Sequence, residues 1–183
     1  MPPTALRLHR ADRDHPGERI ETAGRRLSLK NTFEYADGMR LVIPALPIWT
    51  AEDIRGRFEW VAQVKFGDFI DGAGTMRLGT MLEPIEMNVN GPTYKFRIQP
   101  RTKFLLGVKY AVFLEEHQDE FPQLAHLPDS LRIHFAGVPL VDAEGQWFVP
   151  YLRPEGGRVT LDFKRIKIGF FESDRVAHMT RAA

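Results

Sequence analysis

Apolar and polar residues alternate along much of the chain from about residue 27 onwards. Within residues 57–66 every even-numbered residue is apolar, and every odd-numbered residue except Val61 is polar. Residues 131–135 and 159–163 repeat this alternation. A period of two places successive side chains on opposite faces of a β-strand. The pattern therefore predicts strands that each have one buried and one solvated face.

The alternation changes parity once, close to the C-terminal end. The apolar residues are odd-numbered over 159–163 and even-numbered over 166–170. One extra residue in a strand moves every later side chain to the other face of the sheet. We therefore expect a β-bulge near Lys164 and Arg165.

Glycine-containing turns separate the alternating segments, and four of them predict hairpins, at residues 36–38, 90–93, 143–145 and 154–157. A three-residue loop at 143–145 would set Val141 opposite Trp147. At 90–93, Pro92 lacks the amide hydrogen that a two-residue Asn-Gly turn requires. A four-residue loop followed by a strand over 94–98 is therefore expected there.

Helical signals are few. Thr50 followed by Ala51, Glu52 and Asp53 resembles a helix start, and residues 114–121 form a second candidate that ends before Pro122. About ten short strands joined by tight turns predict an all-β fold, an antiparallel meander that forms a barrel or a sandwich with one or two short helices. The sequence leaves the choice between barrel and sandwich open.

The domain organisation follows from composition. Residues 1–24 mix four arginines with four acidic residues and three prolines, and they contain few large apolar side chains. Such a segment buries too little surface to order itself, so a flexible N-terminal arm is expected. Residues 25–183 are expected to form a single β-rich domain, because a chain of 183 residues with 43% hydrophobic residues supports one core.

Several reaction classes lack their motifs. The chain has no cysteine, which excludes disulfides, thiolate zinc sites and cysteine nucleophiles. None of its three serines lies in a Gly-x-Ser-x-Gly turn, and the glycine-rich phosphate loops of nucleotide-binding folds are absent. We therefore expect no cofactor and favour a function other than catalysis, without excluding an enzyme.

The compartment is inferred from hydropathy. The first ten residues carry Arg7 and Arg10 where a secretory signal would be apolar. The longest apolar run, over 104–114, contains Lys109 and is too short to span a bilayer. We expect a soluble, cytoplasmic protein that does not interact with membranes.

A basic stretch over 95–109 contains no acidic residue. If it forms strands, the aromatic rings of Tyr94 and Phe96 face the core while the neighbouring charges face water, where solvation or cross-strand pairing explains them. An anion-binding or partner-binding surface is the alternative, with Arg97, Arg101 and Lys103 as its candidates. Trp49, which follows Pro44 and Pro47 in an irregular segment, is a candidate interface anchor.

An acidic stretch follows over 115–120. As a helix it would place like charges four residues apart, and a bound cation would relieve their repulsion. Oxygen ligands with one histidine suit manganese, iron or magnesium. The candidate ligands are Glu115, Glu116, His117, Asp119 and Glu120. A solvated acidic face explains the same residues and is the favoured interpretation, because no metal-binding spacing is present.

The remaining conspicuous residues receive ordinary structural roles. His126 and His134 are expected at the surface, since His134 shares the polar parity of its segment. Trp60 and Trp147 follow the apolar parity and are expected in the core rather than beside a ligand.

Three functions are consistent with these patterns. The first is a non-enzymatic β-domain that binds a macromolecular partner, a protein, through loops or an open sheet edge. The second is a β-barrel that binds a small hydrophobic ligand, with lyase or isomerase chemistry if a carboxylate and a tyrosine face its interior. The third and weakest is nucleic-acid binding by residues 95–109, which the net charge of +1 disfavours. The oligomeric state stays open.

Overall fold

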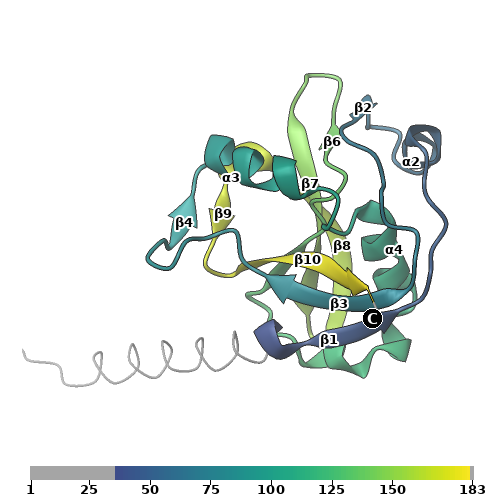
Figure 1. Ribbon diagram of the computed structural model, residues 1–183, viewed down its shortest axis with the longest axis vertical. Helices are drawn as coiled ribbons and strands as arrows, with labels where there is room; N and C mark the ends of the chain where they lie inside the picture. The colour runs from purple at the N-terminus through teal and green to yellow at the C-terminus, as the bar shows by residue number, and fades with distance from the viewer. Residues whose placement is uncertain (1–35, 182–183) are drawn as a thin grey trace, which may run out of the picture. The chain divides into compact units, whose positions relative to one another are not determined.

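The computed structural model of the protein describes residues 36–181 (Figure 1). The expected N-terminal arm, residues 1–24, lies outside the described residues, as does the first strand of the hairpin predicted at 36–38. Within residues 36–181 ten strands form two sheets. The predicted β-rich class with a few short helices is therefore confirmed.

The larger sheet has eight strands. Along the sheet the order is β1 (Arg40–Ile43), β3 (Gly74–Gly79), β10 (Asp174–Arg181), β5 (Arg132–His134), β7 (Trp147–Glu155), β6 (Leu140–Val141) and β2 (Gln63–Val64), and β8 (Arg158–Arg165) also pairs with β7. All pairs are antiparallel except β5 with β10. The order of the described strands does not return to β1, so they form a mixed open sheet rather than a closed barrel or a pure meander.

Two predicted hairpins are confirmed, the first of them with its predicted register. In the β6–β7 hairpin Val141 lies opposite Trp147, and Gly145 has the positive φ of 77° that the three-residue loop needs. In the β7–β8 hairpin Glu155 lies opposite Arg158, and both intervening glycines have positive φ. Glycine adopts that backbone without a Cβ clash, which is why these turns were readable from the sequence.

The strand predicted over 94–98 is wrong. These residues belong to α3 (Gly91–Ile98), whose Asn90 cap accepts a hydrogen bond from the Thr93 amide at 2.9 Å. Asn before a helix and Pro in its first turn are helix-start signals, although the same residues are common in turns. The small second sheet, β4 (Asn88–Val89) with β9 (Phe170–Phe171), forms beside this helix instead of a hairpin.

The single strand predicted over 57–66 is also wrong. The helix start at Thr50 is confirmed, with a reciprocal Thr50–Asp53 capping box, but α2 (Ala51–Arg57) runs to the first residue of that segment, and residues 58–62 form a turn and irregular backbone. Only β2 forms further on. The predicted helix lies earlier than expected, as α4 (Val108–Glu116), followed by the 3₁₀ turns η2 (Gln118–Glu120) and η3 (Pro122–His126).

The predicted β-bulge near Lys164 and Arg165 is replaced by the end of a strand. β8 stops at Arg165, and the 3₁₀ turn η4 (Ile166–Ile168) leads through Gly169 into β9. Gly169 has φ of 90°, and a Cβ there would lie 2.1 Å from the Val89 carbonyl oxygen. The change of parity thus marks a turn between two sheets.

The main sheet carries a hydrophobic cluster on each face. On one face, side chains of α4, including Tyr110 and Leu114, pack with Leu152 of β7. On the other face, Tyr94 of α3 packs with Val149 of the same strand. Figure 1 shows α3 and α4 on opposite sides of β7 and β8. The layers are therefore helix, sheet and helix, and no described helix is long and apolar enough to cross a membrane.

Candidate functional site

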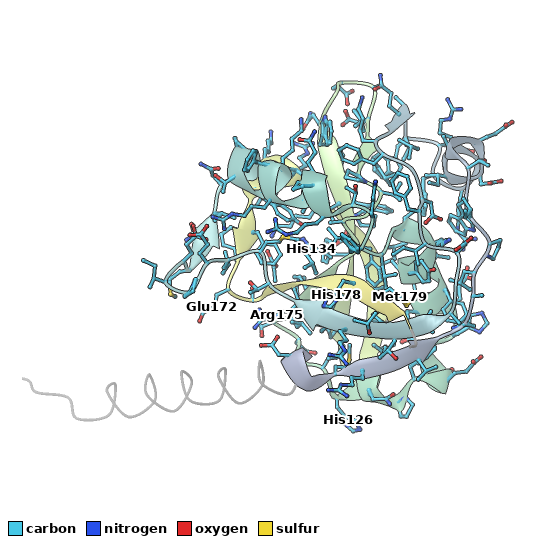
Figure 2. The ribbon with its side chains drawn as sticks, in the orientation of Figure 1. His126, His134, Glu172, Arg175, His178 and Met179 are labelled. Atoms are coloured by element: carbon cyan, nitrogen blue, oxygen red, sulfur yellow. The ribbon has the colours of Figure 1, made fainter. Side chains whose placement is uncertain are left out.

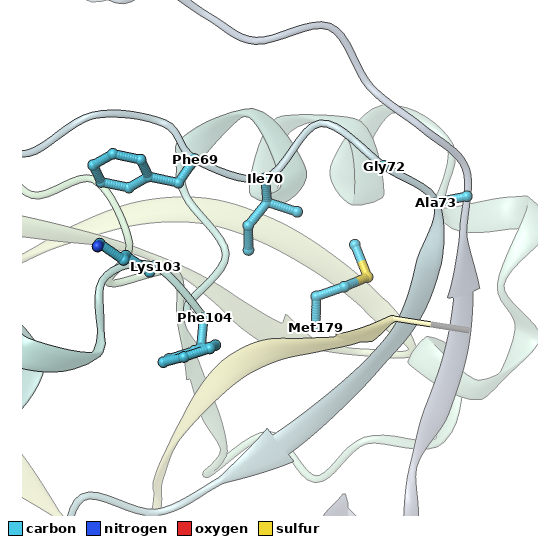
Figure 3. A pocket seen from close by; sticks show the side chains of 7 residues that line it. All are labelled: Phe69, Ile70, Gly72, Ala73, Lys103, Phe104 and Met179. Carbon is cyan, nitrogen blue, oxygen red and sulfur yellow. The ribbon is translucent and has the colours of Figure 1, made fainter. Parts of the chain in front are cut away.

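A cavity of about 530 Å³ opens between two loops at the end of β10 (Figure 3). One wall is the loop between β2 and β3, and the other is the segment that follows the 3₁₀ turn η1 (Gln99–Arg101). The lining residues are Phe69, Ile70, Gly72, Ala73, Lys103, Phe104 and Met179. We call this cavity the loop pocket.

The loop pocket is apolar and open to solvent. Phe69 is 49% exposed and Phe104 is 65% exposed, although both are large aromatic side chains. Figure 3 shows Phe69 and Ile70 across the pocket from Phe104 and Met179. Lys103 is the one ionisable residue in the lining, and it forms no ion pair with any described residue. The pocket therefore combines exposed aromatic surface with a single free cation.

A buried ion pair fixes the first wall. The Lys109 ammonium of α4 lies 2.7 Å from an Asp68 carboxylate oxygen, and the two side chains are 2% and 4% exposed. Lys109 also donates to the carbonyl oxygens of Pro47 at 3.1 Å and Ile70 at 2.5 Å, and the Trp49 amide donates to Asp68 at 3.2 Å. Helix α4 thus holds two irregular segments, 44–49 and 67–73, by polar bonds in place of sheet hydrogen bonds.

Tyr110, next to Lys109, reinforces this attachment. Its hydroxyl donates a hydrogen bond to the Ile70 carbonyl oxygen at 3.1 Å. Burial, together with the nearby Asp68 and Asp71 carboxylates, raises the pKa of Tyr110. The phenol therefore stays protonated and remains a donor to the pocket loop at physiological pH.

The second wall is fixed by pairing with β10. The Leu106 amide donates to the Ala177 carbonyl oxygen at 3.0 Å, and the Met179 amide donates to the Phe104 carbonyl oxygen at 3.2 Å. The exposed ring of Phe104 is consequently carried on backbone that belongs to the sheet. Both walls of the loop pocket are therefore bonded to the rest of the fold.

The three predicted basic candidates separate in the structure. Arg97 bonds Glu86 at 2.5 Å and the Met81 carbonyl oxygen at 2.6 Å, so its charge clamps α3 to the preceding loop. The Arg97 hydrogen bond lowers the pKa of Glu86 to about 2. Arg101 donates to the Arg97 carbonyl oxygen at 2.6 Å. Of the three, only Lys103 lines the loop pocket.

The fourth candidate, Trp49, lies in a different cavity. It is half-buried and lines a hollow of about 480 Å³ with Ile48, Asp53 and Arg57 among the other lining residues. The Arg57 guanidinium carbon lies 5.6 Å from the centre of the Trp49 ring, a cation–π contact. Trp49 reaches the loop pocket only through the hydrogen bond of its amide to Asp68.

The acidic candidates do not converge on one site. Their partners differ: Glu115 accepts from the Leu161 amide at 2.7 Å, Glu116 pairs with Arg57, Asp119 lies 3.4 Å from Arg158, and His117 Nδ1 lies 2.9 Å from Glu120 Oε1. Among the described residues no group of three or more His, Cys, Asp or Glu side chains could hold a metal ion. Glu115 instead accepts a hydrogen bond from a backbone amide on the outer edge of β8. Gln118 does the same for the Val159 amide, at 2.9 Å.

His134 lies in the core rather than at the surface. It is 0% exposed, its Nδ1 is 2.7 Å from the Tyr94 hydroxyl, and its Nε2 is 3.5 Å from an Asp174 oxygen. The other Asp174 oxygen accepts from the Lys164 ammonium at 2.6 Å. The alternation placed His134 on the polar face of β5, but α3 covers that face, and no sequence signal marked this.

Protonation in this buried group follows from its surroundings. Burial lowers the pKa of His134, so the imidazole is neutral. Burial raises the pKa of Asp174, but the contact with the His134 ring and the hydrogen bond and charge of Lys164 outweigh it and leave that pKa below its ordinary value. Because His134, Tyr94 and Asp174 are all sealed from solvent, we assign them a structural role that joins α3, β5 and β10.

No protein-family model, curated protein or solved structure significantly matches the chain, so its function is inferred from the chemistry of the site itself.

Proposed function

We propose that this protein is a non-catalytic binding domain that docks an apolar segment of a protein partner into the loop pocket. The observation that carries the proposal is the exposure of Phe69 and Phe104 on two loops that the rest of the fold holds rigid. Aromatic side chains around a pocket are typical centres of binding energy in protein interfaces.

Rigidity favours binding through this pocket. An interface loses part of its binding energy when loops must be ordered on association. The Lys109–Asp68 pair and the hydrogen bonds to β10 order both walls beforehand. Positioning Phe69 and Phe104 therefore requires little additional loss of conformational entropy when a partner binds.

Charge suggests the sequence of the partner segment. Lys103 is unpaired among the described residues and lies at an otherwise apolar pocket. An Asp or Glu next to an apolar anchor residue in the partner would pair with it. Rim charges of this kind contribute mainly to specificity and association rate.

Two observations favour loop docking by a non-enzyme over the alternatives. The pocket lining supplies one ionisable group, Lys103, and therefore no pair for general acid–base catalysis. The outer edge of β8 is occupied by Glu115 and Gln118, so a partner strand would have to displace them to add to the sheet there.

A small apolar carboxylic acid is a second candidate ligand. The volume of about 530 Å³ is within the range of small-molecule sites, and an apolar lining with one cation suits an amphipathic anion. This retains the hydrophobic-ligand hypothesis without a barrel interior.

Affinity capture with three bait proteins tests the proposal: wild type, Phe104→Ala and Phe96→Ala. Phe96 is the matched control, because it is also a highly exposed phenylalanine, at 76%, but lies on α3 outside the loop pocket. We expect a protein that wild type and Phe96→Ala retain and Phe104→Ala loses, with weaker retention by Lys103→Gln. Native mass spectrometry of the purified protein distinguishes the second candidate, which predicts a retained small acid that Lys103→Gln releases. Equal capture by all baits and no retained molecule would refute both.

A further inference from the structure

A second groove, of about 440 Å³, lies where the start of α3 meets the β6–β7 hairpin. Its lining is Gly91, Pro92, Lys95, Gly145, Gln146, Trp147, Arg165, Ile166 and Lys167. None of these residues lines the loop pocket. We call it the Trp147 groove.

Two lysines lie over the Trp147 ring, and two further basic residues line the groove. The Lys95 ammonium lies 3.6 Å from the centre of the ring, and the Lys65 ammonium lies 5.7 Å from it. Lys167 lines the same groove, and so does Arg165, whose guanidinium carbon is 5.8 Å from the centre of the Phe148 ring. No acidic residue is in the lining, and none of these four cations forms an ion pair with a described residue.

The acidic residues nearest in sequence face elsewhere. Asp142 and Glu144 of the β6–β7 hairpin line a different cavity, with Trp60 and Phe148. Asp142 also accepts a hydrogen bond from the Gln146 amide at 2.8 Å. The concentration of positive charge in the Trp147 groove is therefore not neutralised by its own hairpin.

Two further features point to a planar, hydrogen-bonding ligand. The side-chain oxygen of Gln146, which lines the groove, is buried and has no hydrogen-bond partner among the described residues. Phe66 has a φ of 62°, which is unfavourable for a bulky side chain, and its ring meets Trp147 edge to face at 6.2 Å. Strained backbone of this kind concentrates at binding sites, and here it supports the orientation of Trp147.

We infer that the Trp147 groove binds a nucleoside phosphate, either as a free nucleotide or within a single strand of nucleic acid. The base stacks on Trp147, the phosphate is paired by Lys95 and Lys167, and the Gln146 oxygen accepts a hydrogen bond from the base. In the free protein Lys95 covers the ring as a cation–π partner. Binding moves its ammonium from the ring to the phosphate.

This inference relocates the nucleic-acid surface that the basic stretch 95–109 suggested. Of that stretch, Lys95 lines the Trp147 groove, whereas Arg97 is paired with Glu86. The other basic residues of the lining, Arg165 and Lys167, are distant from it in sequence. It is independent of the loop pocket. An acidic peptide is the competing ligand, and the aromatic face with an unpaired amide oxygen favours a base over a carboxylate side chain.

Fluorescence anisotropy with a labelled ten-residue oligo(dT) tests the inference, and unlabelled AMP serves as competitor. Trp147→Ala is expected to weaken oligonucleotide binding by about tenfold or more. Because Trp147 also packs against the core cluster of α3, the test includes a second variant, the Lys95→Gln/Lys167→Gln pair, which alters only side chains at the groove. That pair is expected to weaken binding and to reduce the slope of log affinity against log salt by about 1.4.

Arg55→Gln is the matched control, because it removes one positive charge from α2, outside the groove. It is expected to leave the affinity within about twofold of wild type, since the loss of one distant charge is largely screened. Competition by AMP assigns the site to free nucleotides as well as strands, and binding of the oligonucleotide alone assigns it to strands. Equal binding of an abasic oligomer of the same charge, equal competition by polyglutamate, or no effect of the Lys95→Gln/Lys167→Gln pair would overturn the inference.

Discussion

Lys109 and Asp68 form an ion pair of 2.7 Å in which both side chains are almost completely withdrawn from solvent. Removing two charges from water is expensive, and their attraction compensates only when further hydrogen bonds satisfy the remaining donors and acceptors. Here those bonds go to backbone groups of the two segments that Lys109 attaches to α4. The pair is thus best explained as a device that positions the loop pocket.

Asp68→Ala tests this role, because it leaves the Lys109 ammonium buried without its counter-ion. We expect the free energy of unfolding to fall by about 3–5 kcal/mol, the typical cost of breaking a buried pair from one side. Urea unfolding followed by circular dichroism measures it. Replacing both partners, Asp68→Leu with Lys109→Met, should recover much of that loss but weaken partner capture, because the loop is no longer attached. A loss for Asp68→Ala no larger than that for Arg158→Ala, which breaks an exposed pair, would contradict the argument.

The Arg97–Glu86 clamp has a defined acid limit. Chiefly the Arg97 hydrogen bond, together with that from the Glu83 amide, lowers the pKa of Glu86 from its ordinary 4.5 to about 2. A carboxylate with a depressed folded-state pKa stabilises the fold at pH values above its unfolded pKa, and this contribution is lost as the pH falls through the folded value. The clamp should therefore weaken between about pH 4.5 and pH 2. Carboxyl NMR titration should give a midpoint near 2 for Glu86 and a higher midpoint in Arg97→Gln, where only the Glu83 amide still lowers the pKa.

A midpoint of Glu86 that is the same in wild type and Arg97→Gln would show that another group lowers it. Arg101→Gln is the matched control, because it removes a neighbouring arginine whose one hydrogen bond within residues 36–181 goes to the Arg97 backbone. It should leave the titration of Glu86 unchanged. Protection of the α3 amides from hydrogen exchange should fall over the same pH range, since the clamp holds this helix to residues 81–86.

Buried His134 also makes the fold less stable as the pH falls, but its effect begins at a higher pH than that of Glu86. Burial lowers its pKa below the ordinary 6.5, so below about pH 6.5 the unfolded chain binds a proton that the folded protein does not. Stability is fully present above that pH and declines as the pH falls towards the folded value. Imidazole NMR should give His134 a titration midpoint below 6.5, and a midpoint at or above 6.5 would contradict the effect of its burial.

The partner hydroxyl of His134 can be tested separately. Tyr94→Phe removes the group 2.7 Å from Nδ1 and leaves a buried nitrogen without its partner. We expect a loss of about 1–3 kcal/mol in the free energy of unfolding. Tyr151→Phe is the control, because its hydroxyl bonds the exposed Asp162 and should cost about 1 kcal/mol or less. Equal losses in the two variants would mean that the buried Tyr94–His134 hydrogen bond contributes no more to the free energy of unfolding than an exposed one.

Local patterns predicted the elements that local forces determine. The alternation over 159–163 identified β8, and Gly145 identified the register of the β6–β7 hairpin. Residues 94–98 were wrongly predicted as a strand because their apolar residues, Tyr94, Phe96 and Ile98, alternate with polar ones. Tyr94 and Ile98 are also four residues apart, a spacing that fits a helix. In a helix, the four-residue spacing places Tyr94 and Ile98 on one buried face and leaves Phe96 76% exposed. A segment of five residues is too short to distinguish the two-residue period of a strand from the 3.6-residue period of a helix.

The candidate site was less predictable because tertiary contacts build it. Lys103 was recognisable as a basic residue, but nothing near Phe69 or Phe104 in sequence marks their exposure. The pocket depends on Lys109 reaching Ile70, 39 residues away, and such a contact has no local signature. Likewise, the groups that use the charges of Arg97 and Glu115 lie 11 and 46 residues from them.

Glu115 provides a direct choice between a metal ligand and a structural acceptor. Its carboxylate accepts from the Leu161 amide at 2.7 Å on the outer edge of β8, where none of the described strands bonds that amide. Glu115→Ala should therefore lower the free energy of unfolding by about 1–3 kcal/mol, the cost of leaving a partly buried donor unpaired. Glu115→Gln keeps an acceptor oxygen and should retain most of the stability. Hydrogen exchange at the Leu161 amide should accelerate strongly in the alanine variant and little in the glutamine variant. Glu120→Ala, which removes a nearby acid that bonds only His117 among the described residues, is the matched control and should leave this exchange rate unchanged.

If Glu115 were instead a ligand for Mn²⁺ or Mg²⁺, adding the cation would raise the melting temperature of wild type, and both Glu115 variants would abolish that shift. The geometry predicts no such shift, because the carboxylates of this segment are bonded to separate partners and do not converge on one point.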